Sequence, residues 1–172
     1  MLLSAWQVPY LVDIEQLGRI SVLGPTLQFV TEPLEGAPCI MRGTLPANGS
    51  VPLHSHDDPE TFIPLSGVIE GLIMMDDDHT WVHVAPGTVF HVPGGAMHAF
   101  RNQTVHEAAM LIVSTAKLGR FFEEIGVRVR EGAPPPGPPS DHDVRRFLET
   151  SARYGYWNAS VEENARVGIT LP

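Results

Sequence analysis

The chain has 172 residues, of which 43% are hydrophobic, and this size fits one globular domain with or without an extension. Its formal charge of −9 at pH 7, with no basic stripe, argues against nucleic acid and anionic membrane as partners, because both reward clustered lysine and arginine. The single cysteine, Cys39, cannot form an internal disulfide, and no apolar run reaches the length of about 20 residues that a spanning helix needs, so we expect a cytoplasmic protein.

Short β-like segments dominate the chain from residue 19 to residue 115. They are apolar or β-branched and are separated by clusters of glycine, proline or aspartate. In chain order they span residues 19–23, 26–30, 37–45, 61–65, 68–75, 81–84, 89–92, 98–100 and 108–114. This rhythm is typical of an antiparallel jelly-roll barrel, and it predicts the all-β class. Asp76, Asp77 and Asp78 fall between two segments and predict a solvated hairpin turn.

After residue 115 the apolar residues take up the spacing of an α-helix. Gly126 follows this stretch and can end a helix, so we predict a short amphipathic helix that packs on the barrel. Its apolar face consists of Leu118, Phe121, Phe122 and Ile125.

A proline-rich stretch over residues 133–139 then predicts an extended linker. Ser140 and Asp143 form a capping-box-like start for a second helix, and Ser160 with Glu163 could begin a last one. The chain is therefore divided into a barrel with N-terminal strands, residues 1–115, and a short C-terminal helical extension, residues 116–172. We interpret the extension as a clamp or dimer element, with an active-site lid as the alternative.

Four residues in two separate segments can meet in one cavity. His54 and His56 are two residues apart, so on a β-strand both side chains project from the same face. Glu60 follows after a polar, proline-containing bend that can bring its carboxylate back beside the imidazoles. His98 begins a later strand, directly after an apolar strand and a Pro-Gly-Gly turn.

These residues lie within two motifs that resemble the signature motifs of the cupin superfamily. The first comprises Gly49, His54, His56, Glu60 and Gly67, with four residues between Gly49 and His54 where the family more often has five. The second motif matches at Gly87, Pro93, Gly95, His98 and Asn102. The resemblance covers roughly residues 20–115, is closest to small single-domain bacterial cupins of the quercetin-dioxygenase type, and implies a double-stranded β-helix.

Three neutral imidazoles and one carboxylate suit one divalent transition metal ion, whether Fe, Mn, Ni, Cu or Zn. We therefore predict His54, His56, Glu60 and His98 as metal ligands. The absence of a thiolate argues against a structural zinc site, and four protein ligands leave an open position on a five- or six-coordinate ion. The alternative is that these histidines are core groups of a storage or binding module.

The strand alternation also predicts which side chains line a substrate cavity beside the metal. Phe62 lies two residues from Glu60 and Phe100 two residues from His98, each on the same strand face as its ligand. Met74 and Asn102 are further candidates for this cavity. A purely structural role in the barrel core is compatible with the same pattern.

Three functions follow for a protein with a small-molecule substrate. The first is a dioxygenase that acts on an enolic or phenolic compound, as the resemblance implies, with Glu60 as the general base that takes the substrate proton. The second is a non-redox isomerase, cyclase or lyase in which the metal acts only as a Lewis acid. The third is a binding module without turnover. A homodimer is expected, because cupins often pair through their sheets.

Overall fold

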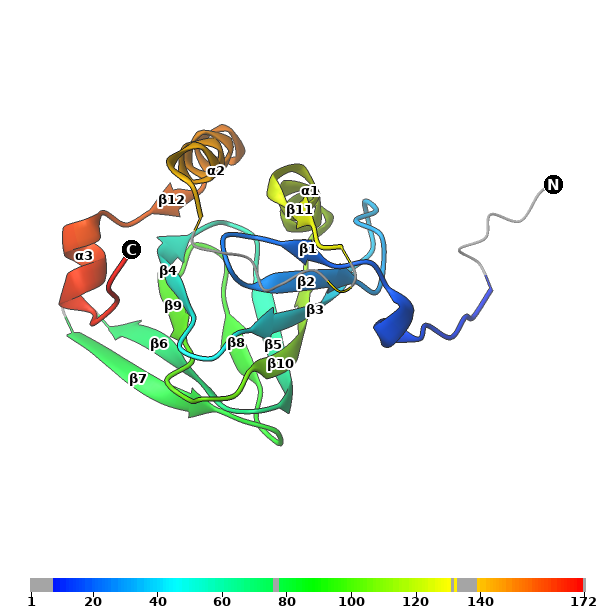
Figure 1. Ribbon diagram of the computed structural model, residues 1–172, viewed down its shortest axis with the longest axis horizontal. Helices are drawn as coiled ribbons and strands as arrows, with labels where there is room; N and C mark the ends of the chain where they lie inside the picture. Colours follow the sequence, from blue (N-terminus) through cyan, green and yellow to red (C-terminus); the bar gives the residue numbers. More distant parts are fainter. Residues whose placement is uncertain (1–7, 76–77, 131, 133–138, 172) are drawn as a thin grey trace.

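Two antiparallel sheets face each other in the computed structural model, which describes residues 8–75, 78–130, 132 and 139–171 (Figure 1). The seven-stranded sheet has the order β11 (Val127–Arg128), β1 (Ile20–Ser21), β2 (Thr26–Phe29), β3 (Cys39–Leu45), β10 (Ala108–Ser114), β5 (Glu60–Ser66) and β8 (Phe90–Val92). The five-stranded sheet has the order β12 (Trp157–Asn158), β4 (Ser50–Ser55), β9 (His98–Arg101), β6 (Ile69–Met75) and β7 (Asp78–Val84). The predicted all-β double-stranded β-helix with a short helical extension is confirmed.

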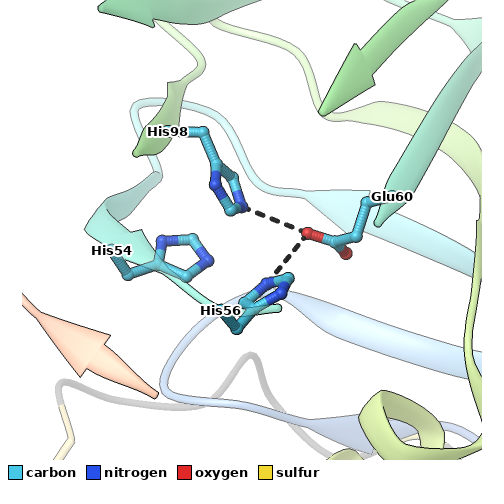
Figure 2. A group of neighbouring side chains, drawn as sticks. All are labelled: His54, His56, Glu60 and His98. Carbon is cyan, nitrogen blue, oxygen red and sulfur yellow. Dashed lines mark hydrogen bonds and ion pairs between the residues drawn. The ribbon is translucent and has the colours of Figure 1, made fainter. Parts of the chain in front are cut away.

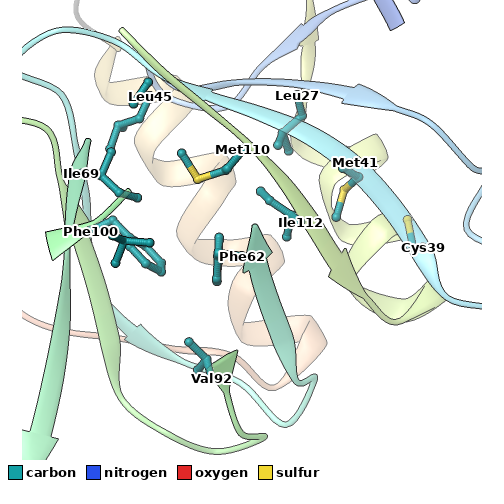
Figure 3. Packing of buried hydrophobic residues seen from close by; sticks show 12 residues of the cluster. Leu27, Cys39, Met41, Leu45, Phe62, Ile69, Val92, Phe100, Met110 and Ile112 are labelled. Atoms are coloured by element: carbon teal, nitrogen blue, oxygen red, sulfur yellow. The ribbon is translucent and has the colours of Figure 1, made fainter. Parts of the chain in front are cut away.

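The main core fills the space between the two sheets (Figure 3). In β3 every second residue is buried, because successive side chains of a strand point to opposite faces. Phe62 from β5 and Phe100 from β9 meet across the interior with their ring centroids 4.4 Å apart. Each is at least 95% buried, and burial of such a side chain is worth about 1.5–3 kcal/mol. These contacts hold the sheets that carry the candidate ligands.

A second core lies on the outer face of the five-stranded sheet. Leu53, Leu72 and Ala99 pack there against Val167 and Ile169 from the C-terminal end of the chain. The indole of Trp81 donates a hydrogen bond to the carbonyl of Val167, with 3.0 Å between nitrogen and oxygen. The five-stranded sheet therefore packs against apolar groups on both faces. On β4, Leu53 points to the outer cluster, and the next residue, His54, points to the interior of the barrel.

Three helices follow the barrel: α1 (Ala116–Ile125), α2 (Asp141–Tyr154) and α3 (Val161–Arg166). Thr115 caps α1 through its side chain, and Gly126 ends it as predicted. Capping boxes begin α2 at Ser140 with Asp143 and α3 at Ser160 with Glu163, so both predicted helix starts are confirmed. A short 3-10 helix, η2 (Ile14–Gln16), precedes the first strand.

The extension also contributes a strand to each sheet, which the sequence did not predict. β11 pairs with β1, and β12 pairs with β4 so that Trp157 lies opposite Ser55 and Asn158 opposite His54. Two-residue strands carry no periodicity that a sequence could reveal, and pairing with an existing edge is what defines them. Backbone pairing thus joins the extension to the barrel at one edge of each sheet.

Some predictions fall outside the described residues. These are the first two aspartates of the turn at residues 76–78 and positions 133–138 of the predicted linker. Among the helices that the structure describes, none is long and apolar enough to cross a membrane.

Gly119 allows α1 to approach β3, and this contact can be tested. A Cβ atom at this position would lie 2.6 Å from Sγ of Cys39 and 2.7 Å from Cβ of Pro33. We expect Gly119→Ala to lower the free energy of unfolding by about 1–3 kcal/mol, because overpacking of a close contact outweighs the gain in helix propensity. Urea denaturation measures the change. Gly18→Ala, at an exposed site with open space around the added methyl group, is the control; equal stabilities of the two variants would contradict the packing account.

Candidate metal centre

Strand register brings four candidate ligands together at one end of the barrel. His54 lies near the end of β4 and pairs directly with His98, the first residue of β9. His56 follows β4 by one residue, and Glu60 is the first residue of β5 on the other sheet. The loop between them contacts the Pro-Gly-Gly turn, where Gly95 donates its backbone N–H to the carbonyl of His56 at 2.7 Å. The four side chains thus come from three strands and one fastened loop.

The four side chains converge on one point (Figure 2). Each offers one nitrogen or oxygen atom, and these four atoms lie within 4.8 Å of one another. The ring centroids of His54 and His98 are 4.1 Å apart, and those of His56 and His98 are 5.1 Å apart. His56, Glu60 and His98 are almost completely buried, whereas His54 is partly accessible. The structure therefore assembles the predicted set of donors.

Backbone carbonyls fix the orientation of all three imidazoles. Nδ1 of His54, His56 and His98 lies 2.7, 2.8 and 2.9 Å from the carbonyl oxygens of Pro52, Asp58 and Ala96, respectively. A carbonyl only accepts hydrogen bonds, so each Nδ1 carries the proton. In a neutral imidazole Nε2 is then left with a free lone pair. This arrangement is the usual one for histidines that ligate a metal.

The buried nitrogen and oxygen atoms that face one another in this cluster require a positive charge between them. Nε2 of His98 lies 3.1 Å and Nε2 of His56 lies 3.3 Å from the same oxygen, Oε2 of Glu60. With neutral imidazoles, two lone pairs would face a carboxylate oxygen with no proton between them. Either a cation or an additional proton must lie there, because unpaired acceptors in a buried site are costly.

The pKa values of the cluster show how protons would meet this demand without a metal. Burial lowers the pKa of His56, but the hydrogen bond to Glu60, the charge of Glu60 and the contacts with Asp58 together outweigh it and raise the pKa above its ordinary value. Burial raises the pKa of Glu60, but the hydrogen bonds from His56 and His98 outweigh it and bring the pKa to about 2. For His54, burial and the nearby His98 lower the pKa to about 3, so its imidazole is neutral at pH 7.

The donor set fits one divalent metal ion. Three imidazole nitrogens and one carboxylate oxygen are borderline-to-hard ligands, suited to the first-row transition metals. The carboxylate is ionised and the Nε2 atoms point away from their backbone partners, as metal binding requires. The site thus suits a divalent cation on geometry, charge and tautomer.

The four residues predicted to line the substrate cavity lie in different environments. Phe62 and Phe100 are on the inner faces of their strands, and the Phe100 ring centroid is 6.0 Å from that of His98. The side chain of Asn102 instead donates to three carbonyl oxygens, those of Leu45, Pro46 and His106. It is 1% exposed and fastens two loops, so it is not available to a substrate.

Met74 also lies away from the cavity. On β6 it shares a face with Leu72, which belongs to the apolar cluster on the outside of the five-stranded sheet. Ile69, which faces the interior, is an odd number of residues away from Met74, so the strand alternation directs Met74 outward. The expectation that Met74 lines the cavity is therefore replaced by a role in the outer packing.

Sequence reasoning missed the side chains that surround Asp58. The Asp57-Asp58-Pro59 stretch is predicted only as a polar, proline-containing bend, and the structure buries Asp58, which is 5% exposed. Its carboxylate accepts hydrogen bonds from the hydroxyls of Thr115 and Tyr156. Burial and the bond to Asp58 raise the pKa of Tyr156 far above its usual value, so the hydroxyl stays protonated and donates. Tyr156 is 98 residues away in the sequence, and no local pattern connects it to this loop.

The fold and the site define a β-barrel with a candidate three-histidine, one-carboxylate metal centre, and comparisons with known proteins agree with the fold. Residues 41–114 match the family model of the cupin domain. None of the curated proteins matches this chain. This family match supports the cupin superfamily, and the solved structures below share the fold.

Three similar solved structures illustrate the shared fold. A predicted oxalate decarboxylase from Thermotoga maritima is 18% identical with a TM-score of 0.53, and the alignment covers 62% of this chain and 98% of that one. A double-stranded β-helix protein from Klebsiella pneumoniae is 15% identical with a TM-score of 0.51, covering 63% and 91%. The cupin domain of Cnp3 from Schizosaccharomyces pombe is 15% identical with a TM-score of 0.51, covering 60% and 71%. At these identities the neighbours show the fold alone.

Metal content tests the assembled donors directly. We expect tag-free protein to hold about one divalent transition metal ion per chain and His98→Ala to lose most of it, because a ligand is removed. Plasma mass spectrometry gives the stoichiometry. His83→Ala, which removes an exposed histidine outside the cluster, should retain the metal.

Metal occupancy should fall as the pH drops through about 6.5, because protons compete for the imidazole nitrogens. Full occupancy down to about pH 4.5 would count against three histidine ligands.

In acid, protonation of His54 should destabilise the protein from which a chelator has removed the metal. Its native pKa is about 3 against an ordinary 6.5, so between these values the unfolded chain binds more protons and stability falls as the pH decreases. Glu60 acts with the same sign between its ordinary pKa of 4.5 and its native pKa of about 2. The raised pKa of His56 acts oppositely, since its contribution is complete below its ordinary pKa and is lost as the pH rises through the native value.

The measurement is the free energy of unfolding from urea titrations between pH 7 and pH 4.5. We expect a smaller acid loss in His54→Gln than in the unmodified protein, because the glutamine does not titrate. Equal losses in the two proteins would show that His54 is not held in its neutral form.

Proposed function

We propose that this protein is a divalent-metal-dependent enzyme that binds a small enolic or phenolic substrate and catalyses its reaction with dioxygen. This is the chemistry of the quercetin-dioxygenase type that the sequence motifs resemble. Both atoms of dioxygen enter the substrate, which supplies the electrons, so no further reductant is required.

The observation that carries the proposal is the orientation of the three histidines. Their Nδ1 atoms are bound to backbone carbonyls, and two Nε2 atoms converge on one carboxylate oxygen in a buried site. A histidine cluster that served only the core would satisfy both ring nitrogens with ordinary partners. The arrangement at Glu60 instead requires a positive charge, which an additional proton supplies in the metal-free protein and a divalent ion would supply in the metal-bound protein.

When bound, such an ion would act as a Lewis acid that acidifies a substrate hydroxyl and brings substrate and dioxygen together. Glu60 is assigned as the general base. Both of its contacts with the histidines among the described residues use Oε2, so Oε1 is the oxygen that we assign to accept the hydroxyl proton. Its low pKa keeps the carboxylate ionised throughout the neutral range.

We propose that aromatic side chains packed beside the centre form an apolar wall of the substrate region. The rings of Phe62 and Phe90 both contact that of Phe100, with centroid distances of 4.4 and 5.6 Å. Phe100 in turn lies beside His98. An apolar wall next to a metal that binds oxygen donors favours a flat organic substrate with a hydroxyl at one edge. We therefore propose Phe62 and Phe100 as pocket residues and leave out Met74 and Asn102.

Oxygen consumption tests the proposed function. Protein stripped of metal with a chelator is reloaded with Fe, Mn, Ni or Cu. It is then mixed with flavonols, enediols and catechols in an oxygen-electrode cell. We expect uptake with at least one metal and substrate class, and incorporation of both atoms of labelled dioxygen into the product. Glu60→Gln should lower the rate by at least about 10²–10⁴-fold, because it removes the base and also a metal ligand.

His98→Ala and His83→Ala are the matched inactive and active controls. Absence of oxygen uptake across the whole panel with metal-loaded protein would overturn the dioxygenase assignment. Turnover with zinc under anaerobic conditions would instead establish a non-redox isomerase, cyclase or lyase. Substrate bound but recovered unchanged after long incubation would establish a binding module.

A further inference from the structure

A buried carboxylate lies directly behind the candidate metal centre. Asp58 is in the loop between His56 and Glu60, and its side chain is 6% exposed. One carboxylate oxygen accepts from the hydroxyl of Thr115, the N-cap residue of α1. The other accepts from the hydroxyl of Tyr156 at 2.7 Å and lies 3.8 Å from Nζ of Lys117. Every one of these partners lies C-terminal to the barrel strands.

The backbone of the same residue orients a candidate ligand. The carbonyl oxygen of Asp58 lies 2.8 Å from Nδ1 of His56, and this contact sets which ring nitrogen faces Glu60. The next residue in the loop is also held, because Ser114 donates its hydroxyl to the carbonyl of Pro59 at 2.8 Å. The position of the loop therefore sets the direction of the His56 lone pair.

Tyr156 is positioned by the C-terminal extension to hold this loop. Gly155 adopts a left-handed conformation with φ of 77°, which ends α2 and turns the chain toward the barrel. Tyr156 then donates its backbone N–H to the carbonyl oxygen of Ser151 at 2.9 Å. The centroid of its ring lies 5.1 Å from that of His56 and 4.9 Å from that of Phe121. The two residues that follow pair with Ser55 and His54. The extension thus contacts both histidines of the His-x-His pair.

We infer that Tyr156 is a positioning residue of the metal centre, which acts through Asp58 to orient His56. Its hydroxyl fixes the Asp58 carboxylate, and Asp58 in turn presents its carbonyl to the imidazole. The inference rests on the proposed metal-dependent function, because it assigns Tyr156 a role in metal binding. Without the hydroxyl, Oδ2 of Asp58 keeps, among the described residues, only the distant ammonium group of Lys117, and the loop loses one of its side-chain anchors while those through Thr115 and Ser114 remain.

The test compares Tyr156→Phe with Tyr154→Phe, a neighbouring tyrosine whose hydroxyl bonds to Glu124 on the surface. Both changes remove one hydroxyl and leave the ring. The affinity for Co²⁺ is measured by competition with a chelating dye, and the visible absorption of the bound Co²⁺ reports its ligand geometry. Loss of a group bonded directly to a metal ligand weakens affinity about 10–100-fold, and because the Tyr156 hydroxyl acts one bond further out, the lower end of this range applies. We expect that loss and an altered spectrum in Tyr156→Phe, and neither change in Tyr154→Phe.

A second readout separates orientation from general loosening of the fold. In the zinc-loaded protein, nitrogen NMR of the imidazoles reports each Nδ1–H separately. We expect Tyr156→Phe to disturb the signal of His56 while those of His54 and His98 stay unchanged. Asp58→Asn, which keeps the loop residue nearly the same size, should disturb the same signal and serves as the test if Tyr156→Phe does not fold.

The outcomes distinguish this inference from the proposed function. If the unmodified protein binds Co²⁺ and Tyr156→Phe matches it in affinity and spectrum, the positioning role is overturned and the metal site stands. If Tyr156→Phe and Tyr154→Phe weaken binding equally, with all three imidazole signals disturbed, the effect is general and the role is also overturned. If the unmodified protein binds no Co²⁺ or other divalent ion, the proposed function and this inference both fail.

Discussion

The structure of the site depends on three hydrogen bonds from imidazole Nδ1 atoms to backbone carbonyls. Because these bonds fix one proton on Nδ1 of each ring, the Nε2 atoms of His56 and His98 face the carboxylate of Glu60 with lone pairs whenever the imidazoles are neutral. A cation resolves the resulting concentration of negative charge, and the low pKa of Glu60 keeps the carboxylate ready to bind it. The candidate metal centre is thus a consequence of backbone geometry, which the two sheets and the ligand loop maintain.

The C-terminal extension maintains that geometry as much as the barrel does. Strand β4, which carries His54, lies between β9 and β12, so the extension protects what would otherwise be an open edge. The same strand is held by Asn164 at the start of the last helix, whose side-chain oxygen accepts from the backbone N–H of Leu53 at 2.8 Å. Tyr156 and Thr115 then fasten the loop beyond the strand through Asp58. These contacts are of the kind expected if the extension is a clamp; that role, like the alternatives of a dimer element or a lid, stays a prediction.

The sequence predicted those parts of the site whose signals are local. The two-residue spacing of His54 and His56 follows from strand geometry, and the helix starts at Ser140 and Ser160 follow from capping chemistry. It failed where the outcome depends on distant partners. Met74 faces the outer cluster because the C-terminal end of the chain makes that face apolar, and Asn102 is consumed by carbonyls of two loops. The bond between Tyr156 and Asp58 joins residues with no shared periodicity, so only the folded chain reveals it.

The most direct test of the account is X-ray absorption spectroscopy of the protein loaded with one equivalent of its preferred divalent metal. The account predicts a first shell of nitrogen and oxygen atoms at about 2.0–2.2 Å, with the outer-shell scattering of three imidazoles and no sulfur. It also predicts that one imidazole contribution disappears in His98→Ala. A shell without imidazole scattering, or one unchanged by that substitution, would contradict the claim that His54, His56, Glu60 and His98 form a metal centre.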